Sequence, residues 1–297
     1  MGKNNALKQT WIKSITLLVF IQVNGQLKEY GNEIGFQYGV APSLGKHQLE
    51  TYHYTFRNRS KVWNVASLFE IEYLNTRFAY FEVPGELNLE EYERLHLVNL
   101  KLEGVKAISR QWDVLFQFNP QLSSNFSSGL SFDDSILGFK IGMVKNWKES
   151  SFSIGIARNT LFGEPTITPF LSYAKKINEQ FHFQLGFPQT LMGFAFDQRH
   201  KLTVSALLQG SSYNITGSDS FLELGAISRT RLNFTAYNLS LTHAYRIQPH
   251  ITTVTQLGLL AGNTLEVENT GGDSLYQFNT NQSLYFSMGL QYKLNRN

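Results

Sequence analysis

The sequence predicts an all-β fold, a transmembrane antiparallel up-and-down β-barrel of about fourteen strands, within a range of twelve to sixteen. The first observation behind this is that apolar and polar side chains alternate along most of the chain, because successive residues of a strand point to opposite faces. In 284–294, for example, Leu284 and Phe286 alternate with Tyr285 and Ser287. About ten residues tilted by roughly 45° are enough to cross a hydrocarbon layer.

Composition and the absence of a long apolar run are the second and third observations. The 297 residues include 23 Phe, 14 Tyr and 23 Gly, but only 16% of them are charged. After the first 25 residues, no segment approaches the roughly 18 uninterrupted apolar residues that a membrane-spanning helix requires. The pattern therefore favours strands as the elements that cross the membrane.

Period-two alternation places the expected strands along the chain. In each strand, large apolar or aromatic residues share one face, and small or polar residues share the other. The expected strands are 34–40, 52–57, 69–73, 98–103, 112–118, 137–143, 152–157, 165–175, 180–187, 190–197, 201–212, 237–246, 251–261 and 284–294.

Two kinds of connection separate these strands, as in barrels with short periplasmic turns and long external loops. Short polar turns include Ser109–Gln111 and Asp197–His200. The long connections are 75–93, 120–133, 213–233 and 262–282. Both ends of an exported chain stay in the periplasm only if the number of crossings is even. Fourteen crossings result when the apolar stretch Phe221–Ile227 belongs to an external hairpin.

Residues 1–25 are expected to be a secretory signal. Lys3, Lys8 and Lys13 form a positive flank before the apolar core Ile15–Ile21, as in signal peptides. An uncleaved amphipathic start on a cytosolic protein is the alternative. Removal of the signal would leave 26–297 as one barrel domain, exported through the periplasm to the outer membrane, with outer-membrane lipid as its partner.

The order of the short turns and three local motifs are similar to those of a known family. The motifs are the loop Ser123–Phe126, the pair Pro165 and Pro169 before a strand, and Gly186-Phe-Pro188. The sequence resembles an uncharacterised Bacteroidetes-type family of outer-membrane β-barrels that carries a domain of unknown function, over roughly 30–294. The resemblance implies a barrel in the outer membrane. It transfers no catalytic or ligand-binding residue.

Charged side chains of both signs fall on the face opposite the apolar one. They are Arg57, Glu70, Glu72, Lys101, Glu103, Asp113, Lys140, Arg246 and Lys293. Charge in hydrocarbon costs several kcal/mol, so these residues are expected to line the lumen and face water or one another. An open lumen would pass small polar solutes with little ion preference, whereas pairs across the lumen would close it.

The space inside the barrel bears on this choice. Fourteen strands enclose more room than eight strands do, which favours a channel. The loops 75–93 and 262–282 are long enough to fold inward as constrictions, which would instead favour a closed barrel. Three functions stay open: a passive channel, a structural or surface-interaction barrel with a closed lumen, and a lipid-modifying outer-membrane enzyme.

No motif predicts a catalytic residue, a metal site or a cofactor. The chain has no Cys, which excludes thiolate chemistry, and its 7 His show no metal-binding spacing. His243 lies on the apolar face and is expected beside an aromatic girdle. Asp133 and Asp134 are expected to be solvated loop charges.

The overall charge and the alternative fold complete the expectations. The net charge of +3 is scattered along the chain, so no nucleic-acid partner is expected. The alternative fold is a soluble β-sandwich or a lipocalin-like binder. In such a protein the apolar faces would pack together in a core instead of against lipid. The sequence does not predict the oligomeric state.

Overall fold

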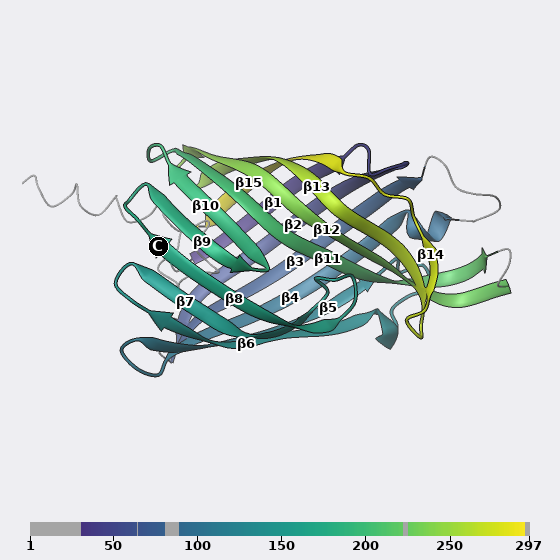
Figure 1. Ribbon diagram of the computed structural model, residues 1–297, viewed down its shortest axis with the longest axis horizontal. Helices are drawn as coiled ribbons and strands as arrows, with labels where there is room; N and C mark the ends of the chain where they lie inside the picture. The colour runs from purple at the N-terminus through teal and green to yellow at the C-terminus, as the bar shows by residue number, and fades with distance from the viewer. Residues whose placement is uncertain (1–30, 64, 81–88, 222–224, 295–297) are drawn as a thin grey trace, which may run out of the picture.

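The computed structural model describes residues 31–63, 65–80, 89–221 and 225–294, without the side chains of 218–228. The predicted signal at 1–25 lies outside the described residues. The described chain forms one antiparallel sheet that closes on itself as a barrel (Figure 1). Of the fifteen strands described, fourteen form the wall, and the short β14 (Ser274–Gln277) pairs only with β13. The predicted fold class and strand number are therefore confirmed.

The wall strands follow one another in chain order around the barrel. They are β1 (Gly31–Ala41), β2 (His47–Val62), β3 (Val65–Tyr80), β4 (Arg94–Ala107), β5 (Trp112–Ser124), β6 (Ser135–Asn146), β7 (Ser150–Asn159), β8 (Thr166–Lys176), β9 (Phe181–Phe187), β10 (Gln189–Ala195), β11 (His200–Phe221), β12 (Gly225–Gln248), β13 (Ile251–Asn269) and β15 (Ser283–Leu294). Two short 3₁₀ turns lie in the connections, η2 (Glu90–Tyr92) and η3 (Phe132–Asp134).

The ring closes where the first wall strand pairs with the last. In β1 and β15, Asn32 lies opposite Leu294, and Val40 lies opposite Phe286. We call the end with the connections 108–111 and 196–199 the turn end, and the end with 125–134 and 270–282 the loop end. Within the described residues, no helix is long and apolar enough to cross a bilayer.

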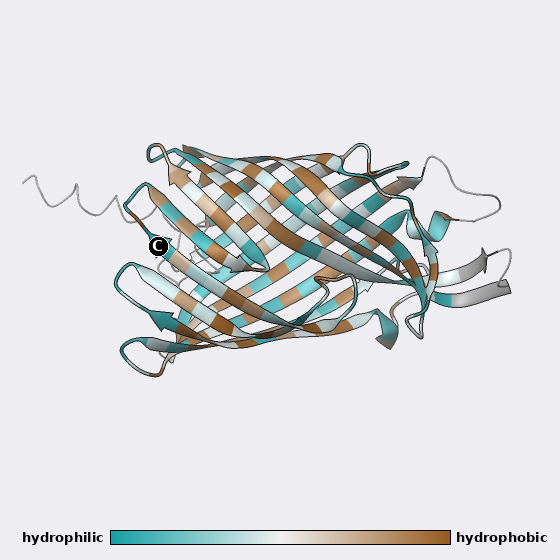
Figure 2. Cartoon of the chain, in the orientation of Figure 1, coloured by the Kyte–Doolittle hydropathy of each residue, from teal (hydrophilic) through white to brown (hydrophobic). Residues whose placement is uncertain are grey.

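The two faces of the wall differ in exposure, and this difference follows the alternation in the sequence. In β15, the apolar side chains of Leu284 and Met288 are 65% and 53% exposed, whereas Ser287 is fully buried. Apolar and polar bands alternate along the other strands in the same way (Figure 2). We call the outward rows of exposed apolar residues the apolar belt, and the opposite face the inner face.

Two of the predicted connections are wrong for most of their length. The segment 213–233 is mainly strand, because β11 runs to Phe221 and β12 begins at Gly225. In 262–282, β13 continues to Asn269 and β14 follows. The prediction that Phe221–Ile227 forms a hairpin, not a crossing, is confirmed by the pairing of Phe221 with Gly225.

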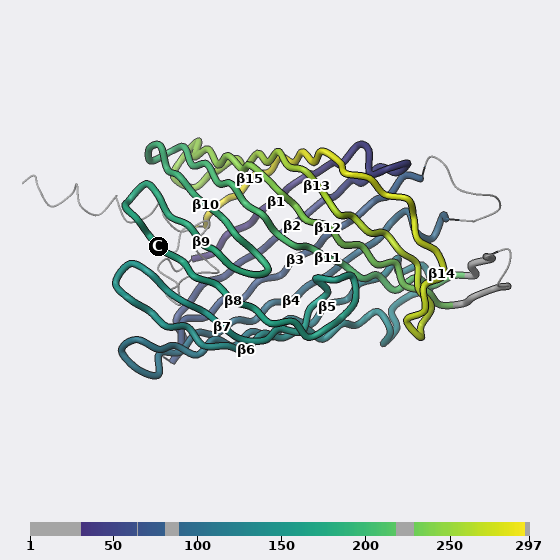
Figure 3. The backbone as a smooth tube through the Cα atoms, viewed as in Figure 1, coloured from purple at the N-terminus to yellow at the C-terminus, as the bar shows by residue number. Residues whose placement is uncertain are grey.

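The wall is not equally high all the way round. Pro188 alone connects β9 to β10, and their hairpin turns back well before the end that β11 and β12 reach (Figure 3). Beyond it, β11 meets β5 directly, with Asn214 beside Ser124 in a parallel pairing. The hydroxyl of Ser123 donates a hydrogen bond to the carbonyl of Ser212 at 2.6 Å. The loop end is therefore narrower than the rest of the barrel.

Candidate functional site in the barrel interior

A row of charges with alternating sign crosses five neighbouring strands on the inner face. Each member lies directly opposite the next in the strand register. The row consists of Lys293 on β15, Glu33 on β1, Arg57 on β2, Glu70 on β3 and Lys101 on β4. We call it the charge ladder. Opposite charges that face each other across strands stabilise a sheet, and the register places each of these charges beside one of opposite sign.

Arg57 is the centre of the ladder. Its Nη1 lies 3.3 Å from Oε1 of Glu33, and its Nε donates to a carboxylate oxygen of Glu70. Arg59, two residues along β2, approaches the other oxygen of Glu33 at 3.9 Å. Glu33 is only 2% exposed, and a carboxylate so buried requires such partners.

A second polar group lies next to the ladder, toward the loop end. Nε2 of His53 is 2.6 Å from Oε1 of Glu72. The amide of Asn99 donates to Oε2 of the same carboxylate at 3.1 Å. Glu72 therefore has a partner on each of the two strands that flank β3.

The other four charges predicted to line the lumen lie on the inner face but apart from the ladder. Asp113 accepts a hydrogen bond from the amide of Asn146 at 2.8 Å. Nζ of Lys140 lies 4.2 Å from the centre of the Phe170 ring. Glu103 and Arg246 stand opposite the neutral residues Gln117 and Thr252. Whether all nine charges line water stays a prediction.

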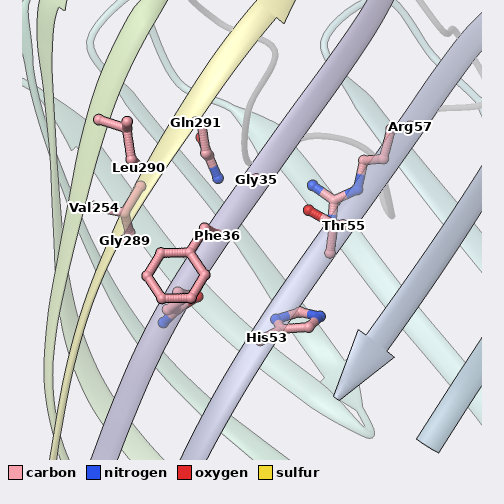
Figure 4. Close-up of a pocket in the computed structure, with 10 residues that line it drawn as sticks. Gly35, Phe36, His53, Thr55, Arg57, Val254, Gly289, Leu290 and Gln291 are labelled. Carbon is pink, nitrogen blue, oxygen red and sulfur yellow. The ribbon is translucent and has the colours of Figure 1, made fainter. Parts of the chain in front are cut away.

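A small hollow opens in the inner face beside Arg57. Its volume is about 50 Å³, and the residues around it include Gly35, His53, Thr55 and Gln291 (Figure 4). Gly35 leaves room for the neighbouring hydroxyl, because a Cβ on Gly35 would lie 2.5 Å from Oγ1 of Thr55. Arg57, His53 and Gln291 supply polar side chains around the hollow, so it suits a polar ligand.

Apolar side chains gather across the loop end of the barrel. We call this group the mouth cluster. It consists of Ala41, Leu44, Leu49, Phe78, Leu89, Tyr92, Leu95, Leu97, Tyr213, Ile215, Leu232, Phe234, Ala236, Leu260, Leu265, Val267 and Phe278. The described parts of the segments 75–93 and 262–282 both contribute to it, which agrees with the inward folding that the sequence left open.

Contacts between strands that are not neighbours hold the mouth cluster together. The rings of Phe78 on β3 and Phe234 on β12 lie 6.3 Å apart, edge to face. The hydroxyls of Thr76 and Tyr213 form a hydrogen bond of 3.0 Å from β3 to β11. The hydroxyl of Tyr92 in η2 bonds that of Thr230 on β12 at 2.7 Å. The β11–β12 hairpin thus packs against β3 and η2 across the loop end.

The structure also corrects the expectation for the acidic pair in the loop 125–134. Asp134 is fully buried and accepts hydrogen bonds from the amide of Asn214 at 2.7 Å and from the backbone of Ser131 at 2.6 Å. Asp133 pairs with Arg229 at 2.8 Å. Asp134 fixes the loop on the outer side of β11 instead of being solvated.

Sequence reasoning missed three buried charged residues of the inner face, Glu33, Arg59 and Lys201. Each continues an alternation that was recognised only in part, since Arg59 comes two residues after Arg57, and Lys201 precedes Leu202. His243 lies with its Nε2 3.2 Å from Nδ1 of His200, whose ring stacks on Tyr245. In the described part of the chain, no group of three His, Asp or Glu residues could hold a metal ion.

Comparison with known proteins gives one family and several solved structures of low similarity. No curated protein matches the sequence. The NanC porin is 10% identical with a TM-score of 0.39, over 89% of this chain and 100% of that one. Omp33 of Acinetobacter baumannii is 9% identical with a TM-score of 0.40, over 91% and 100%. LpxR from Salmonella typhimurium is 7% identical with a TM-score of 0.39, over 88% and 100%.

Likeness at these identities and TM-scores carries no inference about activity. The family match is more direct, because it rests on the sequence of this chain. Residues 51–293 match the model of a family described as Domain of unknown function (DUF6268). Since this match covers most of the chain, the protein belongs to the DUF6268 family.

Proposed function

We propose that the protein is an outer-membrane β-barrel that gives small polar solutes a passive route through a charged interior. The observation that carries this proposal is the contrast between the two faces of one wall. An apolar belt covers the outside, and the charge ladder crosses the inside. A barrel in lipid needs this arrangement, since its outer side chains meet acyl chains and its inner ones meet water or each other.

We infer the location and the lipid partner from the same contrast. The apolar belt includes Ile34, Leu241 and Leu257, which are 47%, 42% and 55% exposed. Exposed apolar rows on every side of a protein are costly in water, so we place outer-membrane lipid around them. Export through the periplasm is part of this proposal, and a Bacteroidetes-type origin stays a prediction. The proposed mechanism is passive and uses no catalytic residue or cofactor.

The mouth cluster means that passage requires a movement at the loop end. The β11–β12 hairpin reaches the opposite wall through Tyr213 and Phe234. A solute that enters from the turn end therefore meets an apolar barrier, and the barrier opens only if the hairpin leaves β3 and η2. We infer a channel that is closed in this structure.

A second function is favoured by the same cluster. If the hairpin never moves, the barrel is a structural or surface-interaction protein whose loops face the cell exterior. The cluster contains 17 buried apolar residues, which is a substantial core for one end of a barrel. The two functions differ in whether ions ever cross, so conductance separates them.

The test is conductance of the refolded full chain in planar bilayers. The variant Phe78→Ala/Phe234→Ala removes the ring pair that joins opposite walls, and we expect larger or more frequent conductance steps than in the wild type. The matched control is Phe194→Ala/Phe196→Ala, a ring pair 4.9 Å apart whose members are 36% and 56% exposed on the outside. The control is expected to behave as the wild type.

The outcomes divide the two functions. Steps in the wild type, or in the inner variant alone, support the channel. A flat baseline from the wild type and from both variants, with correct folding shown by heat-modifiable migration, contradicts the channel and supports the closed barrel.

A further inference from the structure

Beyond the charge ladder, a group of cations occupies the inner face at the turn end. Lys293 on β15 forms one end of the ladder. Past it, the ring continues through β13 to β12, which carries Arg246, and to β11, which carries Lys201. Lys201 stands opposite Ala244, two residues before Arg246 on β12. Thr252 on β13 lies between Arg246 and Gln291, and Gln291 is two residues before Lys293 on β15. We call Lys201, Arg246 and Lys293 the cationic wall.

The strand register explains why this wall is different from the ladder. Lys293 stands opposite Glu33, so its charge has a counterpart on the neighbouring strand. Lys201 stands opposite Ala244, whose partner on the other side is Val254. No carboxylate lies in register with Lys201 on β12 or β13, so the sheet itself does not neutralise it.

The ammonium group of Lys201 is the clearest sign of an unfilled site. The residue is 8% exposed, and its Nζ is buried without a hydrogen-bond acceptor among the described residues. A buried polar group without a partner is costly, and a buried charge more so. An external anion would remove that cost by accepting hydrogen bonds from Nζ.

We propose that the cationic wall binds an anionic group, a carboxylate or a phosphate, of a solute inside the barrel. Lysine and arginine form their strongest hydrogen bonds with such groups. The solute class rests on the proposed function, since the ligand must reach the interior. The hollow beside Arg57 is close, because Gln291 at its rim lies two residues from Lys293 on β15. A ligand held at the wall can therefore place its polar part there.

The experiment measures binding without requiring conductance. The refolded full chain in detergent is titrated calorimetrically with inorganic phosphate and, separately, with acetate. We expect saturable binding of at least one anion and a loss of about tenfold or more in affinity in Lys201→Gln. Arg246→Gln, tested separately, is expected to weaken the same binding. The matched control is Lys145→Gln, which replaces a lysine beside Trp112 and Trp147 on the outer side and should bind as the wild type.

Each outcome decides something. Phosphate binding alone assigns phosphorylated solutes, acetate binding alone assigns carboxylates, and binding of both assigns a general anion site. No saturable binding by the folded wild type overturns the proposal, and so does equal weakening by Lys145→Gln. Binding without conductance supports the anion site and contradicts the proposed channel. Conductance with no binding does the reverse.

Discussion

Arg57 lies between two carboxylates of neighbouring strands, and its removal would leave both without their main partner. It contacts Glu33 at 3.3 Å and also donates to Glu70. Breaking a buried ion pair leaves an uncompensated charge in a poorly solvated place, which costs on the order of 3 kcal/mol. We expect Arg57→Gln to lower the unfolding free energy of the refolded barrel by about that amount, measured by guanidinium titration in lipid vesicles.

An exposed arginine provides the control for this prediction. Arg229 pairs with Asp133 at 2.8 Å, but its side chain is 60% exposed. Surface pairs of this kind contribute about 1 kcal/mol or less. If Arg57→Gln and Arg229→Gln cost the same, the ladder does not stabilise the wall in the way we describe.

Glu268 is expected to make the folding stability depend on pH. It lies at the loop end, near the last residue of β13 and away from the apolar belt. Burial and the neighbouring carboxylates of Glu164 and Glu266 raise the pKa of Glu268 to about 7. Between the ordinary glutamate pKa and this value, the unfolded chain loses the proton while the folded protein keeps it. Folding stability contributed by this site is therefore present at low pH and lost as the pH rises toward 7.

We expect Glu268→Gln to be more stable than the wild type at pH 8, by on the order of 1 kcal/mol. The two should be equal near pH 4, where Glu268 is neutral in both states. Guanidinium unfolding at the two pH values measures the difference. Glu149→Gln, in the exposed turn before β7, is the control and should show no such change. A constant difference across the pH range would contradict this explanation.

Individual residues also show what the sequence can and cannot predict. Alternation alone assigned Arg57, Glu70, Lys101 and Lys293 to one face. It could not show that they stand opposite one another, because the register between strands depends on turn lengths and hydrogen bonding across the sheet. The ladder is therefore a property of pairing, and single-strand patterns do not contain it.

The β11–β12 hairpin is the element that the sequence described least well. The part of the hairpin near the loop end lacks the usual contrast between an apolar and a polar face, because both of its faces are covered. Tyr213 and Leu232 belong to the mouth cluster on one face. On the other face, the amide of Asn214 donates to Asp134, and the hydroxyl of Thr160 donates to the carbonyl of Gly210. Since polar residues are buried there too, the segment resembles a loop in the sequence.

Leu232 tests whether packing in the mouth cluster holds this hairpin in place. It is fully buried, and truncation of such a leucine to alanine costs about 2–5 kcal/mol. We expect Leu232→Ala to increase amide hydrogen exchange in the upper parts of β11 and β12, measured by mass spectrometry, and to leave the turn end protected. Leu239→Ala is the matched control, since Leu239 is 47% exposed on the same strand. Equal exchange in both variants would mean that the cluster does not hold the hairpin.

At the scale of the whole molecule, an even strand number and the closure of the ring could be predicted from the sequence. The even number follows if both ends of the chain stay on one side of the membrane, and a barrel in lipid leaves no open edge, so β1 is expected to pair with the last strand, as it does with β15. The packing across the loop end could not be predicted in the same way. It depends on contacts such as that between Tyr92 and Thr230, 138 residues apart, and such contacts follow from the shape of the finished barrel.

Whether lipid or water surrounds the barrel is a property of the whole molecule. It is tested by the free-energy cost of an arginine placed at different depths along the outer surface. Leu241 lies near the middle of the outward row on β12, and Ile247 lies at its turn end; they are 42% and 46% exposed. An arginine at the midplane of a bilayer costs about 2–4 kcal/mol, against roughly 0–1 near the interface. We expect Leu241→Arg to destabilise the vesicle-refolded barrel by the larger amount and Ile247→Arg by the smaller. In a water-soluble barrel the two equally exposed positions would tolerate arginine equally. Equal and small losses of stability in both variants would therefore contradict the membrane location.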